Sequence, residues 1–424
     1  MENDFDQDQI GELPQSIIEI ILAKLPIRDA VRTSILSRRW RFRWASLTHL
    51  VFDDNCVIYD DDRSVVENNL LNFITKLLFL HNGPIHKFAI TTSYLQGAPD
   101  VDQWLLFISR KEVRELVLEL GEGEWFRAPS CLFSCKKLTR LELVRCELEI
   151  PPNFRGFLCL KYLNLQQVLI PPSDIEYLIS SCPLLESMTL SYFDSLELTV
   201  HAPKLKYLIL EGEFKDICLA NTPNLVAISV GMYMTDDIAE HFEHSSSCNF
   251  NKFLGGVPKL QRLIGHIYFT KYLSIGNRRG WNSFTYHHLK FIELYQVSFD
   301  DEKEVCVVLQ LIENSPNLLE LQISGSSTSS AATRNIDLDF WDRKLSSNFM
   351  FHRLKTVKMA DVFGVPSELN FIKYLLEHSP VLELMSVTPS LYVRDRRLSM
   401  SIDMLSFRRA SPQATVIFNP DHQA

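Results

Sequence analysis

The chain has 424 residues, which exceeds the usual limit for one compact core and predicts either several domains or an elongated repeat architecture. Hydrophobic residues make up 46% and charged residues 22%, a composition that excludes wholesale disorder. The formal charge of -9 disfavours nucleic acid as a partner of the whole molecule, because an acidic surface repels the phosphate backbone.

The N-terminus and the cysteines indicate the compartment. Met1 to Asp8 is acidic and lacks the basic and apolar regions of a secretory signal, and no apolar run approaches the roughly 18 residues of a membrane span. We therefore expect a protein of the cytosol or nucleus, with no membrane partner. In that reducing environment the nine scattered cysteines are expected to be small buried hydrophobes.

Residues 11 to 47 are predicted to form three short helices. Pro14 suits a first helical turn, an apolar stripe follows it, and Pro26 ends the helix. A second helix is expected to turn Ala30, Val31, Ser34 and Ile35 to one face. Ser37 is a plausible N-cap for a third helix, with Trp40 and Trp44 on one side.

A segment of about forty residues with so much apolar surface cannot complete a core alone, so it needs another protein or the rest of the chain. Its residues, E-L-P-Q-S-I-I-E-I-I-L-A-K-L-P-I-R-D-A-V-R-T-S-I-L-S-R-R-W, followed by L-V-F-D-D, closely resemble the plant F-box family in order and spacing.

The resemblance implies that this module docks on a Skp-type adaptor, which joins it to a cullin and a ubiquitin-conjugating enzyme. Leu22 and Ile35 are expected to pack inside the module instead of contacting the adaptor. The positions implied as adaptor contacts are Leu13, Pro14, Ile17, Ile21, Leu25, Val31 and Trp40.

The arginines interleaved with aromatic residues between Arg38 and Trp44 admit a second interpretation as a nucleic-acid patch. We favour a short helix with its aromatic residues inside and its arginines in water, and expect no nucleic-acid partner.

From about Val113 a pattern of three apolar residues recurs. Two other residues separate the first apolar residue from the second, and one separates the second from the third, as in Leu138, Leu141 and Leu143. Its spacing ranges from 20 residues, between Leu185 and Leu205, to 36, between Leu318 and Leu354. Most steps fall in or near the leucine-rich-repeat range of about 20 to 29 residues. The copies begin at Leu138, Leu160, Leu185, Leu205, Leu225, Leu260, Leu289, Leu318, Leu354 and Leu382.

A proline precedes many copies, as in S-C-P-L-L-E at Ser181 and S-P-N-L-L-E at Ser315, and apolar helical stretches come before several of these. Stacked strand-plus-helix repeats would bury one continuous core. The usual asparagine after the strand is missing, with Cys146, Val168 or Val297 in its place, which predicts an irregular arc.

The segment from Leu354 to about Asn419 resembles the FBD region that often closes plant F-box proteins, through L-K-T-V-K-M, Y-L-L-E-H-S-P-V-L-E-L-M-S-V and A-T-V-I-F. We expect it to continue the arc and cap it. Two polar stretches, His241 to Cys248 and Gly325 to Ser330, are expected to be loops.

Between the buried positions of each strand, alternate residues should face outward and bind a target. Aromatic side chains there would bury much area for little entropy loss. The strongest candidates are Tyr162, Tyr207, Ile209, Phe291 and Tyr295, and the wider set adds Arg140, Glu142, Asn164, Ser187, Thr189, Arg262 and Glu293.

Catalysis finds little support. Cys131 and Cys135 lie at helical spacing without a second pair of ligands, and His287 and His288 point to opposite sides of a strand, so no metal site or cofactor is expected. No nucleophile elbow or phosphate-cradling glycine loop is present.

The sequence thus predicts an α/β fold: an N-terminal three-helix F-box (8–54), a linking segment and N-terminal cap (55–112), leucine-rich repeats (113–353) and FBD-like C-terminal repeats (354–420). The expected function is that of a non-catalytic substrate-recognition subunit of an SCF-type ubiquitin ligase with an unknown protein target. The alternatives are a repeat scaffold without a role in ubiquitination and, more remotely, an unrecognised hydrolase.

Overall fold

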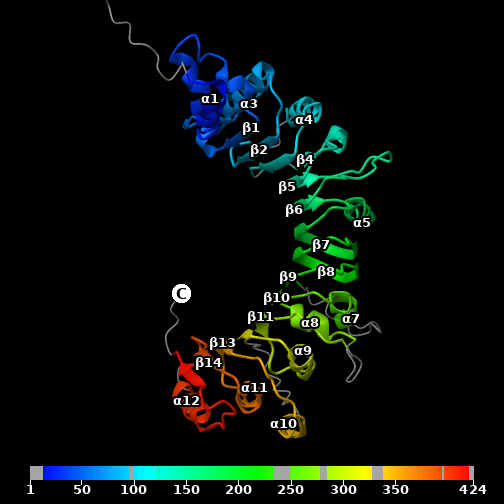
Figure 1. Ribbon diagram of the computed structural model, residues 1–424, viewed down its shortest axis with the longest axis vertical. Helices are drawn as coiled ribbons and strands as arrows, with labels where there is room; N and C mark the ends of the chain where they lie inside the picture. The colour runs from blue at the N-terminus through cyan, green and yellow to red at the C-terminus, as the bar shows by residue number, and fades with distance from the viewer. Residues whose placement is uncertain are drawn as a thin grey trace, which may run out of the picture. The chain divides into compact units, whose positions relative to one another are not determined.

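The computed structural model describes residues 13–95, 100–121, 123, 125–233, 249–276, 284–326, 338–393 and 396–419. The chain divides into two compact units, Met1–Thr189 and Leu190–Ala424, and each is built on a ladder of parallel strands (Figure 1). The stretch His241 to Cys248 and residues 327–330, both expected to be loops, lie outside the described residues.

The first unit opens with short helices that pack on the start of a sheet. These are α1 (Gln15–Ala23), α2 (Ile27–Arg32) and the 3-10 helices η1 (Thr33–Ile35) and η2 (Arg43–Ser46). Prolines 14 and 26 stand at the N-caps of α1 and α2, as their fixed φ favours. The expected third helix is wrong, because turns occupy residues 38 to 42 and only the 3-10 helix η2 follows.

The strands of the first unit follow the order β1-β2-β3-β5-β6, with β4 beside β5. Every pair of neighbouring strands among them is parallel. Their bounds are β1 (His49–Asp53), β2 (Lys87–Thr92), β3 (Glu115–Leu120), β4 (Phe126–Arg127), β5 (Arg140–Glu147) and β6 (Tyr162–Leu169); η3 (Asp54–Cys56), α3 (Arg63–Leu80), α4 (Val101–Ser109), η4 (Ser130–Ser134) and α5 (Pro172–Ser180) connect them.

The ladder therefore begins at His49, well before the first repeat recognised in the sequence. Residues 55 to 112, expected to link and cap, themselves supply the strand β2 and two helices. Val51 pairs with Ala89 and Ala89 with Val117, so β1, β2 and β3 share one register.

The second unit contains most of β7 (Ser187–His201) and then a ladder in sequence order from β8 to β15. In Figure 1 the helices α8, α9 and α11 lie along one side of these strands. The bounds are β8 (Tyr207–Asn221), β9 (Ala227–Met232), α7 (Asn249–Leu254), β10 (Arg262–Gly265), α8 (Phe269–Ser274), β11 (Phe291–Val297), α9 (Glu302–Glu313), β12 (Glu320–Gly325), α10 (Leu338–Leu345), β13 (Thr356–Val362), α11 (Pro366–His378), β14 (Leu384–Pro389), α12 (Arg397–Ser406) and β15 (Thr415–Phe418).

Each predicted repeat from Leu138 onward has its strand two residues after its first leucine. Leu318, for example, precedes β12, and Leu321 and Ile323 point into the core. The fold class is thus confirmed: a mixed α/β protein with a helical N-terminal module, strand-and-helix repeats, and a C-terminal part in which β13, β14 and β15 continue the parallel ladder.

The missing asparagines have a structural substitute. Cys146, Val168 and Val297 are buried, and the residue just before each one has a positive φ: Arg145, Gln167 and Gln296. This left-handed residue resets the alternation of the strand, so that apolar residues three apart both face the core. The register shift between Leu294 and Val297 in the β11–β12 pair records the same bulge.

Candidate functional site: an apolar helical surface and an aromatic strand face

The N-terminal helices divide their apolar residues between a core and a surface. Ile18 and Leu22 lie one turn apart on α1 and are buried with Ala30. Trp40 and Trp44 join them, each about 4% exposed or less. The indole Nε1 of Trp44 donates to Ser34 Oγ at 3.0 Å, and Ser34 Oγ donates to the Arg41 carbonyl oxygen at 2.9 Å, which holds the turns after α2 in place.

Seven other large apolar side chains of this module are exposed. They form what we call the helical surface: Ile17, Ile20, Ile21, Leu25, Ile35, Leu36 and Phe42. Pro14 is exposed and Leu13 and Val31 are half-buried beside them in sequence. A contiguous stretch of chain that exposes so many large apolar residues is typical of a protein-binding module.

Two of the expectations for this module need correction. Leu22 is inside as expected, but Ile35, expected to pack inside, is 86% exposed. Trp40, implied as an adaptor contact, is 4% exposed and offers almost no surface to a partner. Ile20, Leu36 and Phe42 also belong to the helical surface, although they were not among the predicted contacts. The i, i+3 spacing of Ile17 and Ile20 could have indicated Ile20.

Hydrogen bonds with later segments of the first unit hold the module in place. Arg28 Nη1 donates to the carbonyl oxygen of Val57 at 2.8 Å. A ring nitrogen of His81, Nε2, lies 2.8 Å from the carbonyl oxygen of Leu47, and burial lowers the pKa of this histidine. The module is therefore anchored at Val57, just after η3, and at His81, at the end of α3, while its apolar surface stays open.

In the first unit, the outward strand positions carry a polar cluster. The Arg140 guanidinium lies 4.0 Å from the centre of the Tyr162 ring and pairs with Glu142. Asn164, expected to face outward and bind, is only 7% exposed, because Glu142 and Gln166 on both sides hydrogen-bond to its amide. Thr189 is likewise buried. Tyr162 is thus half-covered by its neighbours.

In the second unit, the outward strand positions carry exposed aromatic and aliphatic residues, which we call the strand face. Tyr207, Ile209, Phe291 and Tyr295 are all exposed, as the alternation predicts. The sequence did not predict two further members of this face, Tyr192 and Tyr233. The alternation is broken at both, because Tyr192 has a positive φ within β7 and Tyr233 follows the last residue of β9.

Hydrogen bonds and ring stacking order the strand face. The Tyr233 hydroxyl donates to Glu211 Oε1 at 3.1 Å, and the Tyr295 hydroxyl donates to Glu293. Each carboxylate raises the pKa of the tyrosine that it accepts from, since ionising the phenol would place two negative charges together. The rings of His266 and Tyr295 stack with centres 5.1 Å apart.

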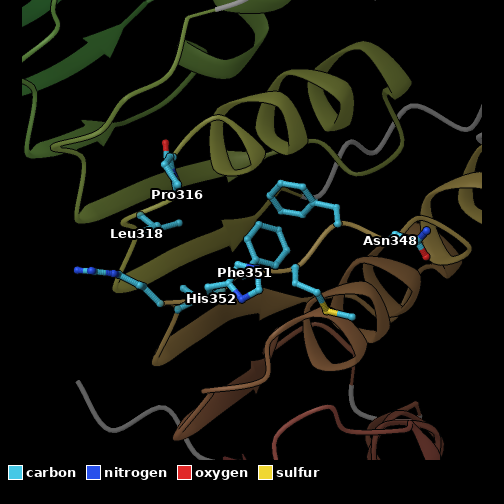
Figure 2. Close-up of a pocket in the computed structure, with 10 residues that line it drawn as sticks. Pro316, Leu318, Asn348, Phe351 and His352 are labelled. Atoms are coloured by element: carbon cyan, nitrogen blue, oxygen red, sulfur yellow. The ribbon is translucent and has the colours of Figure 1, made fainter.

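The second unit also contains a hollow of about 320 Å³, lined by Ser315, Pro316, Leu318 and residues 348–354. Figure 2 shows Pro316 and Leu318, at the junction before β12, beside Phe351 and His352, which precede β13. Its lining is mainly apolar and gathers no set of catalytic groups. Among the described ranges of the chain, no group of three or more His, Cys, Asp or Glu residues could hold a metal ion.

The cysteines follow the expectation in part. Cys56, Cys135, Cys146 and Cys182 are buried, and burial raises the pKa of Cys135 and Cys146 to about 12 each. Cys159, however, is exposed, because it lies in the turn between two repeats. Cys248 lies outside the described residues. Within the part of the chain that is described, no helix is both long and apolar enough to cross a membrane.

Three family models match the chain. Residues 10–51 match the F-box domain, residues 101–323 match the LRR repeats of FBD-associated F-box protein At5g56370, and residues 350–387 match the FBD. These segments correspond to the helical module, most of the repeats, and the β13–α11–β14 region.

Curated relatives match over almost the whole length. The F-box/FBD/LRR-repeat protein At1g13570 of Arabidopsis thaliana is 55% identical over 414 residues, which cover 98% of this chain and 99% of the relative. The FBD-associated F-box protein At4g10400 of the same plant is 27% identical, with 96% and 98% covered. On its sequence, its repeats and its helical module alike, the chain belongs to the F-box/FBD/LRR-repeat protein family.

Proposed function

We propose that the chain is the substrate-recognition subunit of an SCF-type ubiquitin ligase, in which the F-box docks on a Skp-type adaptor and the repeats bind a target protein. The observation that carries the proposal is the helical surface. Seven large apolar side chains of one short module stay exposed although the rest of the unit anchors that module. An adaptor that covers them would remove this apolar area from water.

The proposed adaptor contacts are Leu13, Pro14, Ile17, Ile21, Leu25 and Val31, to which the exposure of Ile20, Ile35 and Leu36 adds three. Trp40 is proposed as the support beneath them, since its ring fills the module's interior. Through the adaptor, a cullin would join the complex.

The proposed receptor needs no reaction centre, because holding the target beside the ligase raises their effective concentration. Its place of action is proposed to be the cytoplasm, the nucleus or both. The eight cysteines within the described ranges are free thiols, as a reducing compartment favours.

Co-expression with a Skp-type adaptor tests the proposal. The parent chain should co-purify with the adaptor at 1:1 stoichiometry, and the double variant Leu13→Ala plus Pro14→Ala should lose the complex. Leu158→Ala, which removes an exposed leucine outside the F-box, is the matched control and should keep it. A parent chain that folds but binds no Skp-type adaptor would refute the proposal.

The alternative, a repeat scaffold without a role in ubiquitination, also predicts protein binding by the strand face. It differs in the outcome of a reconstituted reaction: a scaffold would bind partners and yield no ubiquitin transfer to them.

A further inference from the structure

On the strand face of the second unit, one glutamate in the paired registers of β8 to β12 has no cationic partner among the described residues. Three glutamates occupy outward positions in the paired registers of β8 to β12: Glu211, Glu293 and Glu320. Arg262 pairs with Glu293 at 3.3 Å, and Lys358 pairs with Glu320 at 2.9 Å. Glu211 accepts a hydrogen bond from the neutral hydroxyl of Tyr233 and, among the described residues, forms no ion pair.

Beside Glu211 the strand face has a notch, because the neighbouring strand contributes no side chain there. Gly231 of β9 is the register partner of Glu211. A Cβ atom placed on Gly231 would lie 3.6 Å from Cγ of Glu211 and 3.6 Å from Cβ of His266. The backbone at Gly231 is therefore the floor of the notch, with Glu211 on one side and His266 on the other.

Aromatic rings surround the notch. The ring of Tyr295 stacks on His266 with an interplanar angle of 3°, and Tyr233 is bonded to Glu211. Tyr192 lies near enough to affect the ionisation of Tyr233. All three tyrosines are exposed, yet stacking or hydrogen bonds already order two of them, so that little side-chain entropy remains to be lost on binding.

We infer that this notch, bounded by Glu211, Gly231, Tyr233, His266 and Tyr295, binds one cationic side chain, an arginine or a lysine, presented by a peptide segment of the target. The inference rests on the proposed receptor function and names the chemistry that its target offers. An unpaired carboxylate attracts a cation, and tyrosine rings attract it through their negative faces. The Glu211 carboxylate would repel an acidic segment. An apolar segment would cover the carboxylate and remove its hydrogen bonds to water without replacing them.

The test uses the full chain and a fluorescein-labelled hexa-arginine peptide, with a hexa-glutamate peptide for comparison, in fluorescence anisotropy at fixed salt. The parent should bind hexa-arginine and ignore hexa-glutamate. Glu211→Gln should weaken binding about tenfold or more, since a charge-assisted contact is lost. Gly231→Val should weaken it similarly by filling the notch, where a Cβ atom meets only ordinary van der Waals distances.

Asp403→Asn is the matched control, because it removes the same charge from an exposed position on α12, away from the strand face. It should leave the affinity within about twofold of the parent. Equal weakening by Asp403→Asn, no effect of Glu211→Gln and Gly231→Val, or no binding by the parent would each overturn the inference. Should Gly231→Val fail to fold, Gly231→Ala and Tyr295→Leu take its place.

Adaptor binding is measured on the same preparations. A parent chain that binds the adaptor but not hexa-arginine refutes the notch and leaves the receptor function standing. One that binds hexa-arginine through Glu211 but no adaptor refutes the receptor function and leaves the notch.

Discussion

Ile35 illustrates how a change of helix type redirects a side chain. A continuous α-helix would keep Ile35 on one face with Ala30 and Val31, as the sequence predicts. The structure ends α2 at Arg32 and continues with the 3-10 helix Thr33–Ile35, which has three residues per turn. Ile35 is thereby turned outward into the helical surface, where Leu36 follows it.

Replacing Ile35 by serine should therefore separate binding from folding. We expect Ile35→Ser to weaken adaptor binding by at least about tenfold, because an exposed apolar contact is lost, with little change in thermal stability. Leu22→Ala is the contrasting variant: its side chain is fully buried, and the truncation should cost about 2 to 5 kcal/mol of unfolding free energy. Isothermal titration with the adaptor and thermal unfolding measure the two effects. A destabilised Ile35→Ser variant would contradict the surface assignment.

Two buried glutamates hold the loops that lead into repeat helices. Glu304 Oε2 accepts from Thr270 Oγ1 at 2.6 Å and from the Ser298 amide at 3.3 Å. Glu368 Oε2 accepts from the amides of Phe363, Gly364 and Val365. Burial raises the pKa of each to about 7, although the hydrogen bonds oppose the shift.

The raised pKa values predict a pH dependence of stability. A carboxyl group with a pKa near 4.5 when unfolded and about 7 when folded favours the fold fully below pH 4.5, and this advantage is lost as the pH rises through 7. Between pH 5 and pH 8 the unfolding free energy of the parent should fall by about 2 to 3 kcal/mol more than that of Glu368→Gln, whose side chain stays neutral. Urea unfolding at both pH values measures the difference. Parallel pH profiles of the two proteins would disprove this account.

At the scale of the strand, the left-handed residue is the recurrent feature. Arg145, Gln167, Tyr192, Gln296 and Asp361 all have positive φ, and each precedes a buried residue: Cys146, Val168, Phe193, Val297 and Val362. None of the five is glycine or asparagine, so the sequence offered no conformational signal for the bulge.

Substitution of Gln296 tests the bulge. Gln296→Val should destabilise the protein by about 1 to 2 kcal/mol, because a β-branched side chain resists positive φ. Gln296→Gly should be neutral or slightly stabilising. Gln322→Val, at an ordinary outward position of β12, is the control and should be tolerated. Chemical denaturation measures the unfolding free energy of the three variants. Equal tolerance of valine at positions 296 and 322 would argue against the bulge.

The strands from β5 onward could be predicted because a buried aliphatic residue such as Leu321 or Val357 must alternate with outward residues, and this alternation is visible in the sequence. β1 and β2 could not, because H-L-V-F-D and K-F-A-I-T-T lack the leucine spacing of the later copies and find their place only by pairing with β3.

The candidate site was predictable to a similar extent. Outward aromatic residues inside strands, such as Tyr207 and Phe291, follow from the same alternation. Ile35, Tyr233 and the notch at Gly231 depend on a 3-10 turn, a strand end and a missing side chain, none of which has a periodic signature. The predicted domain boundaries remain predictions.

For the molecule as a whole, the two units carry separate surfaces. The helical surface belongs to the first unit and the strand face to the second, and no residue is shared between them. Variants of one surface should therefore leave the other's binding intact, which makes the two proposed activities experimentally separable.

Ubiquitin transfer in a reconstituted reaction tests the central claim most directly. The reaction would contain the chain, a Skp-type adaptor, a cullin, activating and conjugating enzymes, and a protein captured by the chain. The parent should transfer ubiquitin to that protein. Leu13→Ala plus Pro14→Ala should abolish transfer while capture persists, and Tyr207→Ala plus Phe291→Ala should abolish transfer while adaptor binding persists. Adaptor binding and capture by the parent without any transfer would contradict the account.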